Sequence, residues 1–305
     1  MTRFVLFRIG QSVFTVFGVL TAAFFLVRLS GDPTALLLPE QATAAEVAAL
    51  RTELGLDRPL WLQYGLFLGK ALQGDFGMSF RQHSSALGLV LERLPATLEL
   101  ALTAFVLGIG MAFVAGLALR LSGSRRLRAL FYWIAFVRQA IPIFWFGLLM
   151  ILLFSVSLRW LPSLGRGGIE HLILPALTLA TFEFALYLRL LDAAFSEQQT
   201  QDYVRTAYAK GQTRARTILQ HMLPNALLPI VTVAGINLGV LLGGAVVTET
   251  VFSWPGVGRL IVQSVSQRDY PVIIAGILVT SVVFVLINLL VDLLYAVLDP
   301  RVRLS

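Results

Sequence analysis

The chain has 305 residues, of which 57% are hydrophobic and only 13% are charged, and its mean hydropathy is +0.80. A soluble domain of this length carries far more polar surface, so the composition predicts a polytopic membrane protein. Cysteine is absent, which excludes disulfides and cysteine-ligated metals or clusters. In a membrane protein, the net charge of +7 bears on topology rather than on nucleic-acid binding.

Six segments meet or approach the roughly 20 apolar residues that a helix needs to cross a bilayer. The fourth segment is short and contains Glu183. Before the third segment, the apolar run 129–137 is interrupted by Arg138, Gln139 and Pro142, and we interpret this run as the beginning of the same helix. The predicted fold class is an all-α polytopic membrane protein with six transmembrane helices. The predicted spans are Ile9–Val27, Leu100–Leu119, Ile141–Leu158, Leu172–Leu188, Ala226–Thr248 and Val272–Val291.

Lys and Arg are distributed unequally between the two sets of short loops. Thirteen lie in the two termini and the second and fourth loops, against four in the opposite short loops. Cytoplasmic loops carry this excess, so both termini and the loop 192–225 are predicted to be cytoplasmic. The long first loop, residues 30–97, is then predicted to be extracytoplasmic. We expect one membrane domain, 1–305, without a separate soluble domain.

The long first loop contains signals for two helices. Thr43 and Glu46 form a capping box before an apolar run that ends at Gly55. A second, amphipathic helix is expected after Pro59. Its apolar face would consist of Trp61, Tyr64, Leu68 and Leu72. Two roles stay open for this insertion: packing on the helix bundle, or forming a platform for an external partner.

Between the fifth and sixth predicted spans, the sequence favours irregular backbone. Trp254 is typical of a membrane interface, and Pro255, Gly256 and Gly258 follow it. Irregular backbone near membrane depth persists where it is buried in protein or lines a cavity. A re-entrant turn, an external cap and a simple loop all fit this pattern.

Motifs for catalysis or for nucleotide and metal binding are missing from the sequence. There is no phosphate-binding loop with a Gly-Lys-Ser/Thr ending and no Gly-x-Ser-x-Gly turn. His83, His171 and His221 lie in different loops without zinc spacing. We therefore expect no catalytic residue, no metal site and no cofactor in this chain, which indicates a transport subunit rather than an enzyme.

Polar side chains inside predicted spans are candidates for the translocation pathway, because they are costly in a membrane. Glu183, Asn237 and Asp292 form this candidate set. An internal ion pair or a helix–helix hydrogen bond is the alternative for each of them. Arg138 and Arg189 lie near helix ends, from which they can reach the membrane surface.

The loop 192–225 reads as two helices joined at a glycine. The first is expected from about Asp192 to Gly211, and the second from Thr213 as N-cap to Leu223, where Pro224 breaks it. An ordinary basic loop near anionic headgroups would explain the charge of this stretch. It would not explain the paired helices.

This loop resembles the cytoplasmic loop of importer-type ABC transporter permeases, whose motif is Glu-Ala-Ala, three residues, Gly, nine residues, Ile-x-Leu-Pro. With Gly211 on the glycine of the motif, Ala207, Leu223 and Pro224 also match. Arg205, Thr206 and His221 depart from it, as in the dipeptide and oligopeptide permeases. Seven further segments, among them "ETVFSWPGVGRLIVQSVSQRDYPVI" and "NLLVDLLYAVLDPRVR", resemble the same family in order along the chain.

The resemblance is to permeases of the dipeptide, oligopeptide and nickel importers, and the long outer loop favours their B-type subunit. It implies a type I ABC importer permease fold in the bacterial inner membrane. The implied partners are a second homologous permease, two cytoplasmic ABC ATPases that bind ATP and Mg, and an extracytoplasmic substrate-binding protein, with lipid around the chain and no nucleic acid. Peptides are the implied substrates; nickel chelates, glutathione or another solute are the alternative, and a secondary transporter is disfavoured.

The resemblance and the residue patterns together define two sets of candidate contact residues. The ATPase-coupling set is Arg205, Ala207, Lys210, Gly211, Thr213, Arg214, Leu223 and Pro224. The set for docking the binding protein is Trp61, Trp254 and Gly256.

Overall fold

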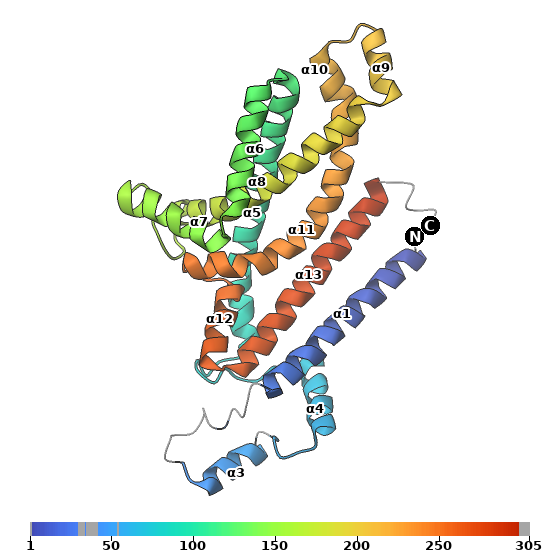
Figure 1. The fold of residues 1–305 in the computed structure, drawn as a ribbon. Coiled ribbons are helices and arrows are strands. Elements are labelled where there is room, and N and C mark those ends of the chain that lie inside the picture. The colour runs from blue at the N-terminus through green and yellow to red at the C-terminus, as the bar shows by residue number, and fades with distance from the viewer. Residues whose placement is uncertain (1, 30–33, 35–41, 54, 299–305) are drawn as a thin grey trace. The chain divides into compact units, whose positions relative to one another are not determined.

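The computed structural model describes residues 2–29, 34, 42–53 and 55–298, which are helical apart from short connections and one isolated β-bridge between Met78 and Ser85. Figure 1 shows the helices in chain order. The chain divides into two compact units. Met1–Pro95 and Gly256–Leu286 form the first, and Ala96–Pro255 and Ile287–Ser305 form the second.

The first unit surrounds an apolar core at the start of one long helix. Val90 of this helix packs with Val257 and Leu260 of α12 and with Val272 and Val279 of α13. The stretch that the sequence left open thus contains a helix, Val257–Gln267, with Gly256 as its N-cap, so it is not a simple loop. The helices of the first unit are α1 (Thr2–Leu29), α3 (Ala44–Glu53), α4 (Leu60–Leu72), the start of α5 (Ala86–Ser122), α12 (Val257–Gln267) and most of α13 (Tyr270–Leu298).

The capping box that the sequence predicts for α3 is present. The Glu46 amide donates to Thr43 Oγ1 at 3.3 Å, and the Thr43 amide donates to Glu46 Oε2 at 2.7 Å. These hydrogen bonds from Thr43 lower the pKa of the Glu46 carboxyl. Gly55 has φ +64°, and the Leu56 amide donates to the Arg51 carbonyl at 2.8 Å, which closes the helix at the predicted glycine.

Helix α4 packs on α1 through a face that differs from the predicted one. The Tyr64 hydroxyl lies 2.6 Å from Thr21 Oγ1, and the rings of Tyr64 and Phe67 lie 5.3 and 5.2 Å from that of Phe24. Trp61 and Leu72, which the helical periodicity placed on the apolar face, are 73% and 89% exposed. Tyr64 and Leu68 of the predicted face are partly buried, and Gln63 is buried beside them. Its amide donates to the carbonyls of Leu56 and Arg58 in the preceding turn.

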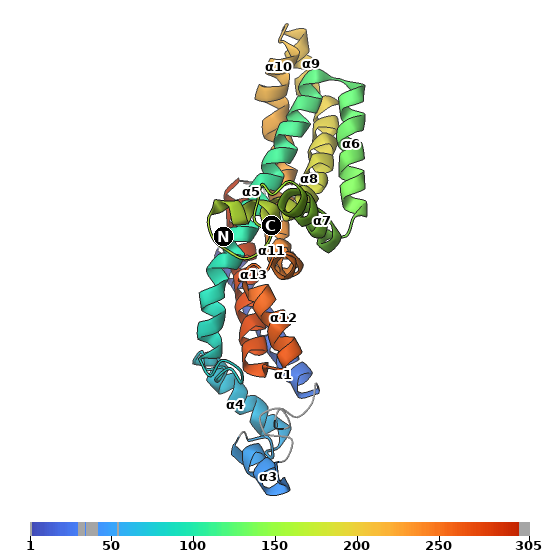
Figure 2. The same cartoon turned by 90° about the vertical axis from the view of Figure 1, so that its left-hand side faces the viewer.

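The second unit has a separate apolar core among long helices. Leu119 of α5, Leu188 and Phe195 of α8, and Ile218 and Met222 at the start of the α11 helix are all buried there. Figure 2 shows α5, α6 and α8 running alongside one another in this unit. Its helices are the remainder of α5, α6 (Arg125–Ala140), α7 (Ile143–Met150), the π-helical segment Ile151–Ser157, α8 (Ile169–Gln199), α9 (Asp202–Ala209), α10 (Arg214–Thr217), the π-helical segment Ile218–Met222 and α11 (Leu223–Val251).

Within the described residues, five helices are long and apolar enough to cross a membrane, and a sixth span exists if α6 and the helix after it are counted together. The all-α polytopic fold is thereby confirmed. The expected continuous helix at the third span is wrong, because α6 and the segment Ile143–Ser157 are bent by 107°. The five spans are Phe7–Leu29, Ala86–Ser122, Ile169–Gln199, Arg214–Gly243 and Tyr270–Val291.

The bend between α6 and α7 has a cause in the sequence. Ile141 precedes Pro142 and adopts the extended conformation that a proline imposes on its neighbour (φ −90°, ψ 123°). Arg138 does not reach the membrane surface as expected, because it is buried at this corner. Its guanidinium donates to the Ile141 carbonyl at 3.1 Å, to the Thr178 carbonyl at 3.0 Å and to Thr181 Oγ1 at 2.8 Å. One side chain thus holds the corner against α8.

Candidate functional site

The loop with the permease-like motif forms a helical hairpin at one end of the second unit (Figure 1). Helix α8 ends at Gln199, a turn at Thr200 and Gln201 follows, and α9 then runs from Asp202 to Ala209. The sequence predicted one helix up to Gly211 and missed this turn. The hairpin therefore has three helical pieces: the end of α8, α9, and the helix that begins with α10.

Gly211 closes α9 in a Schellman motif. It has φ +77°, its amide donates to the Tyr208 carbonyl at 2.9 Å, and the Gln212 amide donates to the Ala207 carbonyl at 3.2 Å. The predicted helix end at this glycine is confirmed. The left-handed conformation is the reason why a residue without a side chain stands here.

Thr213 begins the next helix as predicted, but Pro224 does not end it. Thr213 Oγ1 accepts a hydrogen bond from the Arg216 amide at 3.4 Å. The helix then continues through the π-helical segment into α11 without a break, and Pro224 lies in the first turn of α11. A wider π turn tolerates the proline because it displaces the preceding carbonyls, and the Asn225 side chain donates to the His221 carbonyl at 2.8 Å.

The predicted coupling residues of α9 divide between the protein interior and the solvent. Ala207 is buried, whereas Lys210 is exposed. Arg205 is also exposed, and its guanidinium lies 3.8 Å from the Asp202 carboxylate. Leu223 is partly buried and Pro224 exposed on the helix that follows. One side of the hairpin therefore exposes cationic side chains, while the other side packs on the bundle.

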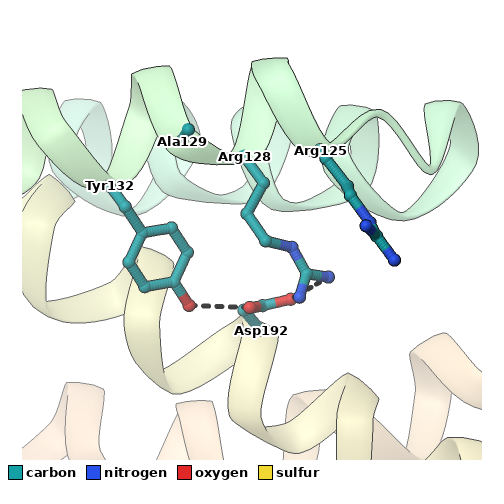
Figure 3. A pocket seen from close by; sticks show the side chains of 5 residues that line it. All are labelled: Arg125, Arg128, Ala129, Tyr132 and Asp192. Carbon is teal, nitrogen blue, oxygen red and sulfur yellow. Dashed lines mark hydrogen bonds and ion pairs between the residues drawn. The ribbon is translucent and has the colours of Figure 1, made fainter.

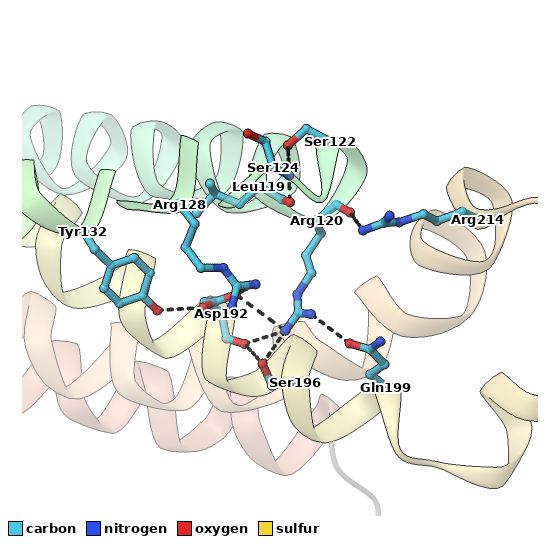
Figure 4. Close-up of polar contacts among 10 residues, drawn as sticks. All are labelled: Leu119, Arg120, Ser122, Ser124, Arg128, Tyr132, Asp192, Ser196, Gln199 and Arg214. Carbon is cyan, nitrogen blue, oxygen red and sulfur yellow. Dashed lines mark hydrogen bonds and ion pairs between the residues drawn. The ribbon is translucent and has the colours of Figure 1, made fainter. Parts of the chain in front are cut away.

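Arg214 connects the hairpin to the end of α5. Its guanidinium donates to the Arg120 carbonyl at 2.8 Å, which satisfies one of the last free carbonyls of that helix (Figure 4). The Arg120 side chain extends from there to α8. It donates to the Asp192 carbonyl at 2.9 Å, to Gln199 Oε1 at 3.0 Å and to Ser196 Oγ.

The Asp192 carboxylate completes a cluster that joins three helices. Its Oδ1 lies 3.5 Å from Arg120 and 3.3 Å from Arg128, and its Oδ2 accepts a hydrogen bond from the Tyr132 hydroxyl at 2.6 Å (Figure 4). We call Arg120, Arg128, Tyr132 and Asp192 the Asp192 cluster. The sequence does not predict this cluster. Its arginines entered the prediction only as topology signals, and Asp192 only as the start of a helix.

A pocket of about 450 Å³ lies beside this cluster (Figure 3). One face of α6 supplies four of its lining residues at helical spacing, and α8 supplies the fifth. The lining residues are Arg125, Arg128, Ala129, Tyr132 and Asp192. None of them belongs to the residue sets that the sequence analysis singled out.

The candidate pathway residues lie on three helices, α8, α11 and α13. Glu183 of α8 is 3% exposed and accepts a hydrogen bond from the Asn237 side chain of α11. The helix–helix hydrogen bond, one of the alternatives for these two residues, is thus present. Asp292 falls in α13, but its side chain lies outside the described residues.

The candidate docking residues have different environments. Trp61 is exposed on α4. Trp254 is 1% exposed, and its indole N–H donates to the Ala96 carbonyl at 2.8 Å, so its side chain offers no surface to a docking protein. This corrects the predicted interfacial and docking role of Trp254. Gly256 is buried at the N-terminus of α12.

Two family descriptions together match almost the whole chain. Residues 104–304 match the family described as binding-protein-dependent transport system inner membrane component, and residues 1–101 match the N-terminal region of such membrane components.

Named relatives are similar over nearly their full length. The chain is 40% identical to the glutathione transport system permease protein GsiC of Escherichia coli strain K12, covering 99% of each chain. It is 37% identical to the di/tripeptide transport system permease protein DppB of Pseudomonas aeruginosa, again covering 99% of each. It is 38% identical to the dipeptide transport system permease protein DppB of Alkalihalophilus pseudofirmus, covering 94% of this chain and 95% of that one.

Two solved structures share the fold at 18% sequence identity. One is from an amino acid ABC transporter crystallised with histidines (TM-score 0.52, covering 70% of this chain and 94% of that chain). The other is from the MetNI methionine ABC transporter in an inward-facing conformation (TM-score 0.54, covering 69% and 96%). With the helical architecture and the hairpin at Gly211, these matches show that the chain belongs to the family of binding-protein-dependent transport system inner membrane components, as a permease subunit of an ABC importer.

Proposed function

We propose that the transporter containing this chain imports short peptides. The three named relatives carry the terms dipeptide, di/tripeptide and glutathione, and glutathione is itself a tripeptide. A short peptide with a free carboxylate is the chemistry common to all three. The substrate-binding protein of the system would deliver the peptide to the outer face of the permease pair.

Uptake into vesicles tests the proposed substrate class. We expect the reconstituted importer with its binding protein to accumulate a radiolabelled dipeptide when ATP is supplied. Unlabelled tripeptides and glutathione should compete at concentrations at least tenfold lower than free glycine or a nickel–histidine chelate. Vesicles without ATP serve as the control. Saturable uptake of a non-peptide solute with no competition by peptides would contradict the proposal.

We further propose that the hairpin 192–225 receives motion from a cytoplasmic ATPase. The observation that carries this proposal is the continuous helical backbone from Arg214 through the π-helical segment Ile218–Met222 into α11. A displacement at the Arg214 end is passed on to α11, because the backbone stays hydrogen-bonded as a helix from one to the other. In this orientation both termini are cytoplasmic, and the loop 30–97 faces the binding protein.

Arg214 and the Asp192 cluster provide a second connection from the hairpin to the bundle. Arg214 holds the end of α5, Arg120 holds α8, and Asp192 holds α6. A displacement of the hairpin would therefore move α5, α6 and α8 together with α11. ATP and Mg would be bound by the two partner ATPases, and a second permease would complete the pathway.

Crosslinking tests the proposed contact with the ATPase. The chain contains no cysteine, so a single introduced cysteine marks one site. Arg216 is exposed, and its side chain donates a hydrogen bond to the Oε1 of neighbouring Gln220 at 3.0 Å. We expect Arg216→Cys to crosslink to an ATPase subunit that carries a cysteine in the facing groove.

The matched control for the crosslink is Trp61→Cys, which is equally accessible but lies on α4 in the predicted outer loop. It should form no crosslink to an ATPase. A crosslink from position 61 with none from position 216 would reverse the proposed orientation and overturn the coupling role of the hairpin.

A further inference from the structure

The pocket beside α6 adjoins the Asp192 cluster, but the proposed coupling assigns no ligand to it, and it has no counterpart among the predicted sites. Arg125, Arg128, Ala129 and Tyr132 line it from α6, and Asp192 lines it from α8 (Figure 3). Two arginines on one helix face, three residues apart, direct their side chains to the same space. The question is which ligand such a space would take.

The charge of the pocket favours an anion. The Asp192 carboxylate is already bound by Arg120, Arg128 and Tyr132, at 3.5, 3.3 and 2.6 Å. Arg125 contributes a further positive charge, and within the described residues its side chain has no hydrogen-bond or ion-pair partner. Three arginines around one carboxylate leave an excess of positive charge. Guanidinium groups bind phosphate well, because their paired N–H donors match two phosphate oxygens.

The rest of α6 indicates where that phosphate comes from. Leu130, Trp133 and Phe136 are 53%, 64% and 72% exposed, which in a membrane helix is an apolar surface for acyl chains. From Arg125 to Trp133 the helix rises about 12 Å. The headgroup layer on each side of the apolar core is about 5–8 Å thick. With Trp133 at the membrane interface, which tryptophan favours, Arg128 lies about 7.5 Å along the helix, within the headgroup layer, and Arg125 lies at its outer edge, from which its long side chain can reach back to a lipid phosphate.

We propose that the pocket lined by Arg125, Arg128, Ala129 and Tyr132 binds the phosphate of an anionic phospholipid. The lipid would lie along the exposed apolar face of α6 with its headgroup between the two arginines. Because Arg128 also binds Asp192, the lipid would contact the same cluster that joins α5, α6 and α8. The proposal does not depend on the ATPase contact or on the transported substrate.

Quenching by brominated lipid tests the site in the assembled importer. Leu130→Cys, which is exposed and directly follows the pocket residue Ala129 in the sequence, carries a bimane fluorophore, and the importer is placed in nanodiscs of phosphatidylcholine with increasing brominated phosphatidylglycerol. We expect half-maximal quenching at a severalfold lower mole fraction than with brominated phosphatidylcholine. Arg125→Gln and Arg128→Gln should each raise that mole fraction about fivefold, since each removes one cation that attracts the anionic headgroup.

Two control variants separate a site from general surface charge. Arg126→Gln removes the same charge from an exposed neighbour that does not line the pocket, and should change the mole fraction less than twofold. Ala129→Phe fills the pocket without changing charge, and should weaken the preference for phosphatidylglycerol as much as either arginine variant. Equal effects of Arg126→Gln and Arg128→Gln, or no effect of Ala129→Phe, would overturn the proposal.

The same samples distinguish other occupants. Inorganic phosphate at matched ionic strength should not relieve the quenching more than sulfate or chloride does. Specific relief by phosphate would show that a soluble anion is the ligand. Quenching equal to that with phosphatidylcholine in the assembled importer, but selective in the isolated chain, would show that a partner protein covers the pocket. Either result rejects the lipid site.

Discussion

Replacing Gly211 with valine is expected to abolish most import while the assembled transporter still hydrolyses ATP. Gly211 has φ +77° and closes α9 in a Schellman motif, with its amide on the Tyr208 carbonyl. An L-residue in this conformation costs about 1–2 kcal/mol, and a β-branched side chain is the least tolerated. The turn therefore opens, and Thr213 and the helix after it lose their position relative to α9. We expect at least a tenfold fall in peptide uptake, with ATP hydrolysis changed less than twofold.

Space is not the cause of this effect, because no atom lies within 4 Å of a Cβ built on Gly211. Asparagine tolerates the left-handed conformation better than other residues with side chains, so Gly211→Asn is the matched control and should retain most of the uptake. Uptake by Gly211→Val equal to that of the unaltered importer would contradict the role assigned to this turn. An equal loss of uptake in Gly211→Val and Gly211→Asn would show that any side chain at this position blocks import, whatever backbone conformation it tolerates.

Local signals in the sequence predicted the ends of several helices correctly. Thr43 with Glu46, Gly211 and Thr213 each act through hydrogen bonds within a few residues, so their residue types are sufficient to predict them. Apolar length likewise predicted the membrane helices and the all-α class. The hairpin could therefore be located from the sequence, with its turn at the right glycine.

The continuation of the helix through Pro224 could not be predicted in the same way. A proline inside a helical pattern normally marks a break, because its ring clashes with a preceding carbonyl. Here a π-helical segment precedes it, and the helix runs on into α11. At Pro142 the outcome is the opposite: Ile141 is extended and the chain turns by 107°. The two prolines differ in the backbone before them: a π-helical segment precedes Pro224, whereas Ile141 before Pro142 is extended.

Contacts between residues far apart in the chain could not be predicted from the sequence either. Arg120 and Asp192 are separated by most of α6, α7 and α8, and Trp254 is far from Ala96 in the chain. Nothing local reveals that a basic residue counted for topology has a buried carboxylate partner. For Trp254, the general preference of tryptophan for membrane interfaces gave the wrong environment, since packing within the second unit decides it.

The close approach of α5 and α8 is expected to make Gly108 irreplaceable for stability. A Cβ on Gly108 would lie 2.5 Å from the Glu183 Cβ and 2.9 Å from the Ala180 carbonyl oxygen. The carbonyl belongs to the backbone of α8, so the two helices must separate to admit a methyl group. Overpacking of this kind costs about 1–3 kcal/mol, and the better helix propensity of alanine offsets up to about 1 kcal/mol. We expect Gly108→Ala to be less stable by about 1–2 kcal/mol, as measured by thermal unfolding in detergent followed by circular dichroism.

Gly110 on the same helix provides the matched control. It is exposed, and no atom lies within 4 Å of a Cβ built on it, so Gly110→Ala should leave the unfolding temperature unchanged or slightly higher. Separation of α5 from α8 would also displace Glu183 from the Asn237 amide that donates to it. Adding Asn237→Ala to Gly108→Ala should therefore cost less than the sum of the two single changes, since the hydrogen bond is already weakened. Equal stability of the two alanine variants, or full additivity in the double variant, would show that α8 accommodates the methyl group without moving.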